Sequence, residues 1–353
     1  KEKKKMTIKS NDSRIRYSGR IDWSVETEPV WVFPCTSAEL KFTGNVFKIH
    51  TRNKRAYWEN YLGVIVDGVQ QCYYLKEGES TIDIILPENE TGEHHVLVFK
   101  RQDSCHEVAI LGFEIEDGAT LLPLDPAPQL KIEVYGDSVS AGEVIEAIDN
   151  TGMEDPQHNG GYSNSWYSYS WMTARKLNAQ IHDIAQGGIA LMDGIGWFLE
   201  PQQIGMESVW DKIHYNPIFG KPAKWNFTQY TPDVVIVAVG QNDAHPYDFM
   251  KLEPDGEQAK QWKTHYRAFL ESLRKVYPDA YIICATTVLE HDGAWDAAID
   301  AIVKEMASEN NDSKVTHYTY RRNGCGTPGH PRITESYEMA DEMAEYVKNV
   351  LKM

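Results

Sequence analysis

Short segments in which polar and apolar residues alternate dominate the chain from about residue 20 to 118. β-Branched and aromatic residues are frequent in these segments, as in strands that bury one face. Turn sequences such as Asp67-Gly68 and Thr91-Gly92 separate them. The predicted strands are Ala38–Phe42, Val46–Thr51, Tyr61–Val66, Ser80–Leu86, His95–Lys100 and Glu107–Ile115. Because no long helical pattern intervenes, this part is predicted to be a β-sandwich of jelly-roll type.

A Pro-rich segment, Leu121–Gln129, leads into a second pattern, in which compact apolar strands alternate with helical periodicity. Such alternation is typical of a parallel sheet covered by helices on both faces. The predicted strands are Ile132–Tyr135, Ile181–Ala185, Val234–Val239, Tyr281–Thr286 and Val315–Tyr320, and the predicted helices are Ser165–Leu177, Gln261–Val276, Trp295–Met306 and Ile333–Leu351. This order predicts a flavodoxin-like three-layer α/β sandwich. The domains are therefore expected to span residues 1–125 and 126–353, with the aromatic, Pro-rich stretch Leu199–Tyr230 as an insertion near the site, outside the core.

Composition narrows the classes of function. The 353 residues suffice for two domains, and a net charge of −17 argues against nucleic acids or anionic membrane surfaces as partners. No apolar run is long enough to span a membrane. Five cysteines without a CxxC pair argue against a disulfide framework and a structural zinc site. We expect a cytoplasmic location if Met6 is the start, and secretion if a signal peptide has been removed.

Candidate chemistry follows the ends of the predicted parallel strands, where open α/β sheets place their sites. The first strand ends in Gly136-Asp137-Ser138, which would present the Ser138 hydroxyl at a helix N-terminus, whose free amides can hold an oxyanion. Gln186-Gly187-Gly188 follows the second strand, and glycine there lets a backbone N–H approach a ligand closely. Gly240-Gln241-Asn242-Asp243 follows the third strand, so that the Asn242 amide can donate to the same oxyanion.

A candidate base stands in Gly326-Thr327-Pro328-Gly329-His330-Pro331, directly before the last predicted helix. A histidine next to proline is rigidly held, which suits a general base. Each block also has an ordinary structural interpretation: a helix cap for Ser138, turns for the glycines and Asn242, and a surface loop for His330. His245 is a second candidate base. The order of the blocks, each at a strand end or in the last loop, favours one joint site.

Other motifs carry less weight. The letters of GxGxxG occur at Gly324–Gly329, but a dinucleotide site requires a βαβ unit and only one helix follows. The GxSxG motif of α/β-hydrolases is absent. His94 and His95 are neighbours on a predicted strand, so they point to opposite faces and do not predict a metal site.

The four blocks, in this order, resemble the SGNH (GDSL) hydrolase superfamily over roughly residues 130–353. With a jelly-roll-like domain before them, the chain resembles carbohydrate esterase family 2, whose members remove O-acetyl groups from plant polysaccharides. The resemblance implies Ser138 as nucleophile and His330 as general base. It also implies an oxyanion hole formed by the backbone N–H groups of Ser138 and Gly188 and the side chain of Asn242. An acetylated carbohydrate is then the expected partner, with no metal or organic cofactor.

One position departs from the superfamily pattern. Most members have an Asp two or three residues before the histidine, where this chain has Pro328 and Thr327. Some family 2 esterases use a Ser-His dyad in which a backbone carbonyl orients the imidazole, so the resemblance implies the Pro328 carbonyl as the partner of the His330 ring N–H. Aromatic residues near the blocks are candidate sugar contacts: Tyr162, Trp166, Trp197 and Trp295.

Two alternatives remain open at this point. Another SGNH activity, a lipase or an acyl-thioesterase, would need a long apolar groove, and the acidic, aromatic-rich composition leans toward sugars. A non-catalytic carbohydrate-binding protein is favoured by the missing acid, whereas the four intact blocks favour an enzyme.

Overall fold

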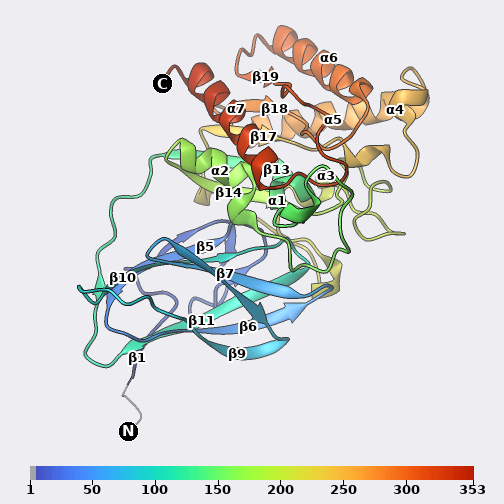
Figure 1. The fold of residues 1–353 in the computed structure, drawn as a ribbon. Coiled ribbons are helices and arrows are strands. Elements are labelled where there is room, and N and C mark those ends of the chain that lie inside the picture. The colour runs from blue at the N-terminus through green and yellow to red at the C-terminus, as the bar shows by residue number, and fades with distance from the viewer. Residues whose placement is uncertain (1–4) are drawn as a thin grey trace.

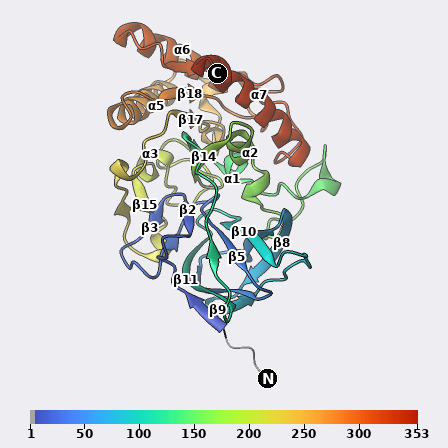
Figure 2. The ribbon, with the colours of Figure 1, turned by 90° about the vertical axis from the view of Figure 1, so that its left-hand side faces the viewer.

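The computed structural model describes residues 5–353 as a β-rich N-terminal part below an α/β C-terminal part (Figure 1). The first described strand, β1 (Lys5–Ile8), lies at the far end of the β-rich part (Figure 1), and the last helix ends on the opposite side of the molecule (Figures 1 and 2). Within residues 5–353, no helix combines the length and the apolarity needed to cross a membrane.

The N-terminal part is a sandwich of two antiparallel sheets around one apolar core. Alternation of buried and exposed residues along β6 shows why one face of each sheet packs inward. One sheet has the order β3-β4-β11-β6-β9 with β1 paired to β11: β3 (Ile21–Asp22), β4 (Val30–Trp31), β11 (His106–Glu116), β6 (Phe47–Arg55), β9 (Gly78–Asp83) and β1 (Lys5–Ile8). The other has the order β12-β5-β10-β7-β8 with β2 paired to β5: β12 (Leu121–Leu122), β5 (Ser37–Thr43), β10 (Glu93–Lys100), β7 (Asn60–Val66), β8 (Val69–Leu75) and β2 (Arg16–Ser18).

All six strands predicted for this part are found, as β5, β6, β7, β9, β10 and β11. The prediction missed β8, which pairs with β7 across the Asp67-Gly68 turn. Its sequence, VQQCYYL, lies at the edge of the sheet and is mostly accessible, so it lacks a clear apolar face. The expected linker also begins later than predicted, because Leu121 and Leu122 pair with β5.

The C-terminal part contains a parallel five-stranded sheet with the order β14-β13-β17-β18-β19. In chain order this is 2-1-3-4-5, the flavodoxin-like arrangement that the sequence predicts. Its strands are β13 (Leu130–Gly136), β14 (Ala179–Ala185), β17 (Val234–Val237), β18 (Tyr281–Cys284) and β19 (Val315–His317), each overlapping a predicted strand.

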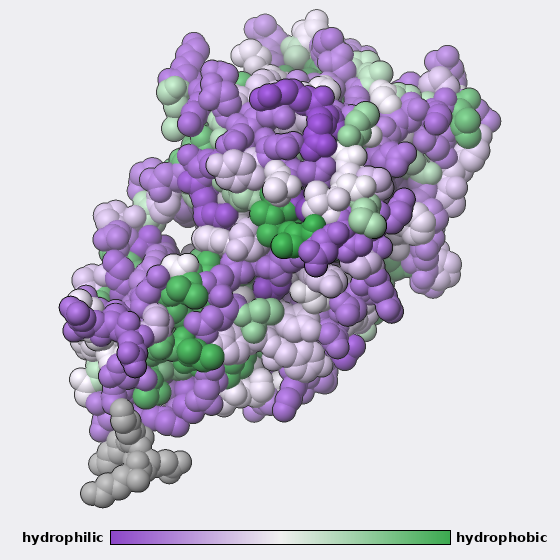
Figure 3. Space-filling view, in the orientation of Figure 1, coloured by the Kyte–Doolittle hydropathy of each residue, from purple (hydrophilic) through white to green (hydrophobic). Residues whose placement is uncertain are grey.

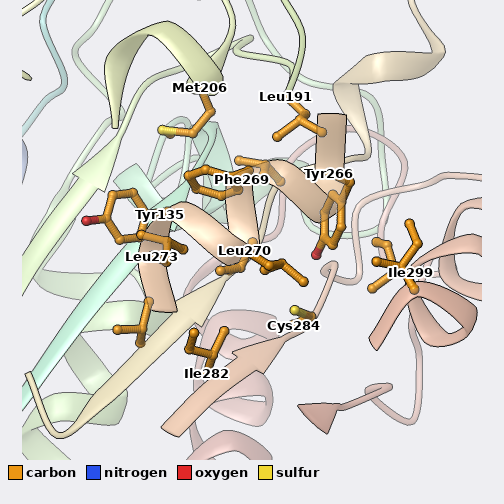
Figure 4. Packing of buried hydrophobic residues seen from close by; sticks show 14 of the residues in the cluster. Tyr135, Leu191, Met206, Tyr266, Phe269, Leu270, Leu273, Ile282, Cys284 and Ile299 are labelled. Carbon is orange, nitrogen blue, oxygen red and sulfur yellow. The ribbon is translucent and has the colours of Figure 1, made fainter. Parts of the chain in front are cut away.

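Helices cover both faces of this sheet. Val134, Ile236 and Ile283 pack in one core cluster with α2 (Tyr169–Lys176) and α7 (Ile333–Leu351). Their neighbours along the strands pack in the other cluster, with α5 (Glu257–Val276) and α6 (Gly293–Asn310), part of which Figure 4 shows around Tyr135 and Leu270. All four predicted helices are present, and the first of them begins as a 3-10 turn, Ser165–Tyr167.

The stretch Leu199–Tyr230 contains α3 (Met206–Val209) and a hairpin of β15 (Lys212–His214) and β16 (Ala223–Lys224). The expectation that it lies outside the core is wrong in part. Met206 is fully buried and packs in the main cluster with Phe269 of α5 (Figure 4). Smaller elements complete the chain: α1 (Ser138–Ala141), α4 (Phe249–Leu252) and the 3-10 turns Ile148–Asn150, Pro217–Phe219, Phe227–Gln229 and Asn242–Ala244.

The two parts share a buried interface. Phe99 at the end of β10 packs against Trp166 and Trp171, so the core of the α/β part continues into the sandwich. Arg20, fully buried, donates hydrogen bonds to Glu133 (3.2 Å) and to the Tyr135 hydroxyl (2.7 Å) beneath the sheet. Polar side chains predominate on the surface in Figure 3, where apolar residues gather in small, separate patches.

Candidate active site

Ser138 is the first residue of α1, directly after β13. Asp137 caps this helix by accepting a hydrogen bond from the Val139 N–H (3.0 Å). Burial raises the pKa of Asp137 to about 6, although hydrogen bonds from Gln241 and Val139 oppose the rise. The Ser138 hydroxyl lies 2.8 Å from Nε2 of His330, which brings the predicted nucleophile and base together. This separation is within the range required for proton transfer from nucleophile to base.

His330 is oriented by Asp155, which sequence reasoning missed. The Nδ1–H of His330 donates to Asp155 Oδ2 at 2.6 Å, and the backbone N–H of His330 donates to Oδ1 at 3.0 Å. Because a carboxylate only accepts, Nδ1 carries the proton and Nε2 is free to accept the Ser138 proton. The prediction that the Pro328 carbonyl orients His330 is therefore wrong, and so is the Ser-His dyad.

Gly329 explains how Asp155 reaches this position. Its φ is +77°, and a Cβ at this residue would lie 2.5 Å from Asp155 Oδ1. Only a residue without a side chain lets the carboxylate approach the backbone beside His330 so closely. Asp155 lies 175 residues before His330, so no fixed spacing to the histidine marks it.

Cations surround the Asp155 carboxylate. Arg332, whose side chain is fully buried, donates from Nη1 to Oδ1 (2.8 Å), and His158 donates from Nε2 to Oδ2 (3.1 Å). Burial alone would raise the pKa of Asp155, but hydrogen bonds from His158, His330 and Arg332 outweigh it and hold the pKa well below its ordinary value. The carboxylate is therefore ionised whenever the site is folded.

His158 bridges two carboxylates. Its Nδ1 lies 3.0 Å from Oε1 of Glu143, while its Nε2 faces Asp155. Hydrogen bonds to Asp155 and to Glu143 raise the pKa of His158 to about 10, so it is an imidazolium at neutral pH. The site thus contains a row of alternating charges that ends at His330.

Asp155, His158 and His330 also offer donor atoms within 4.8 Å of one another, the spacing of a potential metal site. Both ring nitrogens of His158 and both oxygens of Asp155 already have hydrogen-bond partners. A metal ion here would have to displace the proton that orients His330. The arrangement therefore suits acid-base chemistry better than metal binding.

The predicted oxyanion-hole groups line one cavity of about 450 Å³ together with Ser138 and His330. Within residues 5–353, the backbone N–H groups of Ser138 and Gly188 have no protein acceptor. Asn242 differs, since its Nδ2 donates to Asp137 Oδ2 and to the Ile189 carbonyl, both at 3.1 Å. The geometry brings the three residues together as the sequence predicts, and their role in binding an oxyanion stays a prediction.

The sandwich contributes to the same cavity through Tyr57 and Trp58, in the loop between β6 and β7. Trp58 has a φ of +57°, which is rare and strained for a bulky residue, and strain of this kind is concentrated at functional sites. Its ring makes an edge contact with His158. The remaining walls are mainly apolar: Trp197, Phe198, Leu199 and Leu289.

The four aromatic candidates have different outcomes. Trp197 lines the cavity and stacks on His245, whereas Tyr162 is exposed beside a small hollow formed with Trp58 and His158. Trp166 was predicted wrongly, since it packs between Phe99 and Trp171 under the Arg175 guanidinium. Trp295 was also predicted wrongly. It is fully buried on the inner face of α6, with its indole N–H donating to Asp248 (3.0 Å).

His245, the second candidate base, and the acids Asp243 and Asp292 form no hydrogen bond with Ser138 or His330 within residues 5–353. His245 bonds Glu200 (2.7 Å), and Asp292 caps α6. Asp243 accepts hydrogen bonds from the Leu191 N–H (2.9 Å) and the Trp262 indole (2.7 Å), and burial raises its pKa to about 7. The GxGxxG letters fall in the loop before α7 and not in a βαβ unit.

Comparison with known proteins supports the resemblance. Residues 17–125 match the family model described as "Carbohydrate esterase 2 N-terminal". The chain is 28% identical to "Cellulase/esterase CelE" of Acetivibrio thermocellus over 96% of its length, which is 39% of that protein. It is 24% identical to "Acetylxylan esterase / glucomannan deacetylase" of Cellvibrio japonicus, over 98% of this chain and 91% of that one.

Solved structures give the same picture. A family two carbohydrate esterase from Clostridium thermocellum, in complex with cellohexaose, aligns with a TM-score of 0.80 and 26% identity over 96% of this chain and 99% of that chain. A family two carbohydrate esterase from Cellvibrio japonicus shares the fold with a TM-score of 0.82 at 22% identity, over 99% of this chain and 98% of that chain. In the sandwich, the strand-end blocks and the Ser138–His330 pair, the chain is similar to carbohydrate esterases of family 2.

Proposed function

We propose that this protein is a serine esterase that removes O-acetyl groups from plant polysaccharides or oligosaccharides. The observation that carries the proposal is the hydrogen-bonded row Ser138–His330–Asp155 in a cavity where the N–H groups of Ser138 and Gly188 have no acceptor among residues 5–353. Nucleophile, base, orienting acid and oxyanion donors are the parts that acyl transfer requires.

The reaction follows from this arrangement. The Ser138 Oγ attacks the acetyl carbonyl carbon while His330 Nε2 takes the hydroxyl proton. The tetrahedral intermediate collapses when the bond to the sugar oxygen breaks, and the imidazolium gives its proton to that oxygen. A water molecule, deprotonated by His330, then attacks the carbonyl carbon of acetyl-Ser138. Acetate leaves as the bond to Ser138 Oγ breaks, and the imidazolium returns its proton to Oγ. Asp155 holds the required tautomer and stabilises the imidazolium in both steps.

The developing negative charge would be held by the N–H groups of Ser138 and Gly188. In the resting site, the Asn242 amide has its two protons on Asp137 and Ile189. Asn242 therefore joins the oxyanion hole by sharing or exchanging one of these hydrogen bonds. One such donor contributes about 10²–10³ in rate.

Aromatic surfaces favour a sugar as the alcohol part of the ester. Trp58 and Trp197 line the cavity, and aromatic rings stack on the apolar faces of sugar rings. Of the relatives, one is named for acetylxylan and glucomannan deacetylation and another is seen with bound cellohexaose. These names support the same substrate class for this chain.

A non-catalytic carbohydrate-binding protein is now less favoured. That alternative rested on the absence of an acid beside His330, and Asp155 supplies one from elsewhere in the chain. Lipase or acyl-thioesterase activity would need a groove for a long acyl chain, whereas acetyl needs only a small pocket.

We further propose that the sandwich is of jelly-roll type and that the domains are residues 1–125 and 126–353. The matched family model ends at residue 125, and the two sheets are antiparallel throughout.

Two sets of substrates test the proposal: 4-nitrophenyl esters of increasing acyl chain length, and acetylated xylan and glucomannan oligosaccharides. We expect release of acetate from the oligosaccharides and a steep fall in kcat/KM beyond the acetyl ester. Equal or rising activity on octanoyl esters, without acetate release from the oligosaccharides, would favour a lipase or thioesterase.

A further inference from the structure

The loop that joins β10 to β11 is buried where the sandwich meets the C-terminal part. Its residues 101–105 are all buried. Arg101 donates to the Ser163 carbonyl (3.1 Å) and pairs with Glu146 of the C-terminal part. Asp103, which is 3% exposed, faces a different element, the loop after β14 that carries Gly188.

Asp103 holds this loop through one oxygen. Its Oδ2 accepts hydrogen bonds from the Gly187 N–H (2.7 Å) and from Nε2 of Gln186 (2.9 Å). Its Oδ1 accepts from the Cys105 N–H (2.9 Å), which fixes the carboxylate to its own loop. The same side chain therefore ties the sandwich to the two residues that precede Gly188.

Gly187 is clamped between two carboxylates. A Cβ on Gly187 would lie 2.9 Å from Asp103 Oδ2 and 2.3 Å from Oε2 of Glu143. Glycine is required here because the carboxylates approach the backbone from both sides. The Gly187 N–H is thus held by Asp103 of the sandwich, and the Glu143 carboxylate lies close to Gly187 on the other side.

The neighbouring Gln186 extends the same contact. Its side-chain oxygen accepts from the Tyr215 hydroxyl (2.7 Å), and its Nε2 also donates to the Tyr57 hydroxyl (3.2 Å). Tyr57 belongs to the sandwich and lines the catalytic cavity. Every side-chain bond of Gln186 therefore fixes the orientation of the loop after β14.

We propose that Asp103 is a positioning residue for catalysis, through which the N-terminal sandwich holds the Gly187–Gly188 backbone so that the Gly188 N–H points at the reacting carbonyl oxygen. The inference rests on the proposed esterase function, in which Gly188 is an oxyanion donor. It makes the sandwich a component of the active site, since the acceptor of the Gly187 N–H comes from the sandwich. A donor acts on the transition state only when it is held at the place where charge develops.

The test compares Asp103→Ala and Asp103→Asn with the wild-type chain on 4-nitrophenyl acetate. We expect kcat to fall about 10–100-fold in the Ala variant, because a small misplacement of a catalytic group costs up to about 10²-fold. The KM should change little, since the oxyanion interaction develops in the transition state. The Asn variant keeps size and one acceptor oxygen and should retain more of the kcat than the Ala variant.

Arg101→Met is the matched control. It removes a buried charged contact between the same loop and the C-terminal part, but it does not touch the loop after β14. We expect a lower melting temperature with kcat within about twofold of wild type, in line with a lost interface hydrogen bond. Equal loss of kcat in Arg101→Met and Asp103→Ala would make Asp103 a structural residue only.

Other outcomes are equally decisive. If Asp103→Ala does not fold, the Asp103→Asn variant provides the test. A reduced kcat at an unchanged KM supports the proposal, whereas a wild-type kcat at an unchanged KM overturns it. A wild-type chain that releases no acetate from any ester refutes the proposed function itself, independently of Asp103.

Discussion

At the scale of single residues, the site works because charges cancel around the base. Asp155 accepts from His330, and His158, Arg332 and Glu143 complete a partly buried set in which each carboxylate has a cationic partner. A carboxylate with so many donors stays ionised and fixed in place, which is what orienting an imidazole requires.

Asp155→Asn tests the orienting role. The amide can no longer accept from His330, His158 and Arg332 together, and its NH2 favours the wrong tautomer of His330. We expect kcat to fall about 10²–10⁴-fold, the upper value being that of a serine protease whose triad Asp was changed in this way. Steady-state kinetics with 4-nitrophenyl acetate measure it.

Asp243→Asn and Asp292→Asn serve as controls for that variant. Neither residue contacts His330, so each should lose far less activity than His330→Ala. If Asp155→Asn kept the wild-type kcat while His330→Ala was inactive, a Ser138–His330 dyad oriented by a backbone carbonyl would describe the site better than the triad.

His158 gives the stability of the chain a predictable pH dependence. Its pKa is about 10 in the folded chain and near 6.5 when unfolded, because Asp155 and Glu143 favour the cation. The stabilisation is complete below about pH 6.5 and is lost as the pH rises through about 10. We therefore expect His158→Gln to lower the melting temperature most at pH 6 and least at pH 10. If the difference in melting temperature between His158→Gln and wild type stayed constant from pH 6 to pH 10, this account of His158 would be contradicted.

At the scale of elements, strand ends and the loops after them bring the site together. β13, β14 and β17 end side by side, so that Ser138, Gly188 and Asn242 meet, and the loop before α7 adds His330. In the loop before α7, Gly329 leaves the space in which the Asp155 carboxylate approaches the backbone.

Gly329→Ala probes that approach. The new methyl group would collide with the Asp155 carboxylate in a backbone conformation that already disfavours a side chain. We expect a loss of kcat similar to that of Asp155→Asn. Gly118→Ala is a matched control, because Gly118 has a φ of +81° and open space around it. It carries the same backbone strain of about 1 kcal/mol without touching the site. If both variants lose activity equally, strain and not the contact with Asp155 is responsible.

The sequence predicts the elements better than the contacts between distant loops. Strand ends with Gly-Asp-Ser, Gly and Asn are local signals that single out Ser138, Gly188 and Asn242, and the Pro-flanked histidine before the last helix singles out His330. The structure brings these residues to one cavity, and the roles of Gly188 and Asn242 stay predictions. Asp155 and Asp103 reach the site only through the path of the folded chain, and nothing in their neighbouring residues distinguishes them from other acids. The prediction of Trp295 as a sugar contact is wrong for another reason. A residue near the start of a helix can lie on the buried or on the exposed side of that helix, and its neighbours in sequence do not distinguish the two.

At the scale of the whole molecule, the sandwich and the α/β part are joined by buried polar groups as well as by apolar packing. Glu133, a residue of β13, is fully buried and is paired with Arg20 of the sandwich. Burial raises the pKa of Glu133, but the Arg20 charge, together with hydrogen bonds from His182 and Tyr135, outweighs burial and lowers the pKa to about 2. The α/β part therefore depends on the sandwich to neutralise a charge in its own core.

Arg20→Met measures this dependence. Removing one partner leaves a buried carboxylate uncompensated, which costs about 3–5 kcal/mol in the free energy of unfolding. Urea unfolding gives the value, and the double variant Arg20→Met/Glu133→Gln should recover a large part of it. A single variant as stable as wild type would mean that the two parts do not depend on this pair.

The most direct measurement is acetate release from acetylated xylan and glucomannan oligosaccharides by wild type and by Ser138→Ala. A serine esterase with Ser138 as nucleophile predicts release by the wild-type chain and none above background by the variant, at equal melting temperatures. Retention of near-wild-type turnover in Ser138→Ala would contradict the mechanism, and absence of release by the wild-type chain would contradict the proposed function.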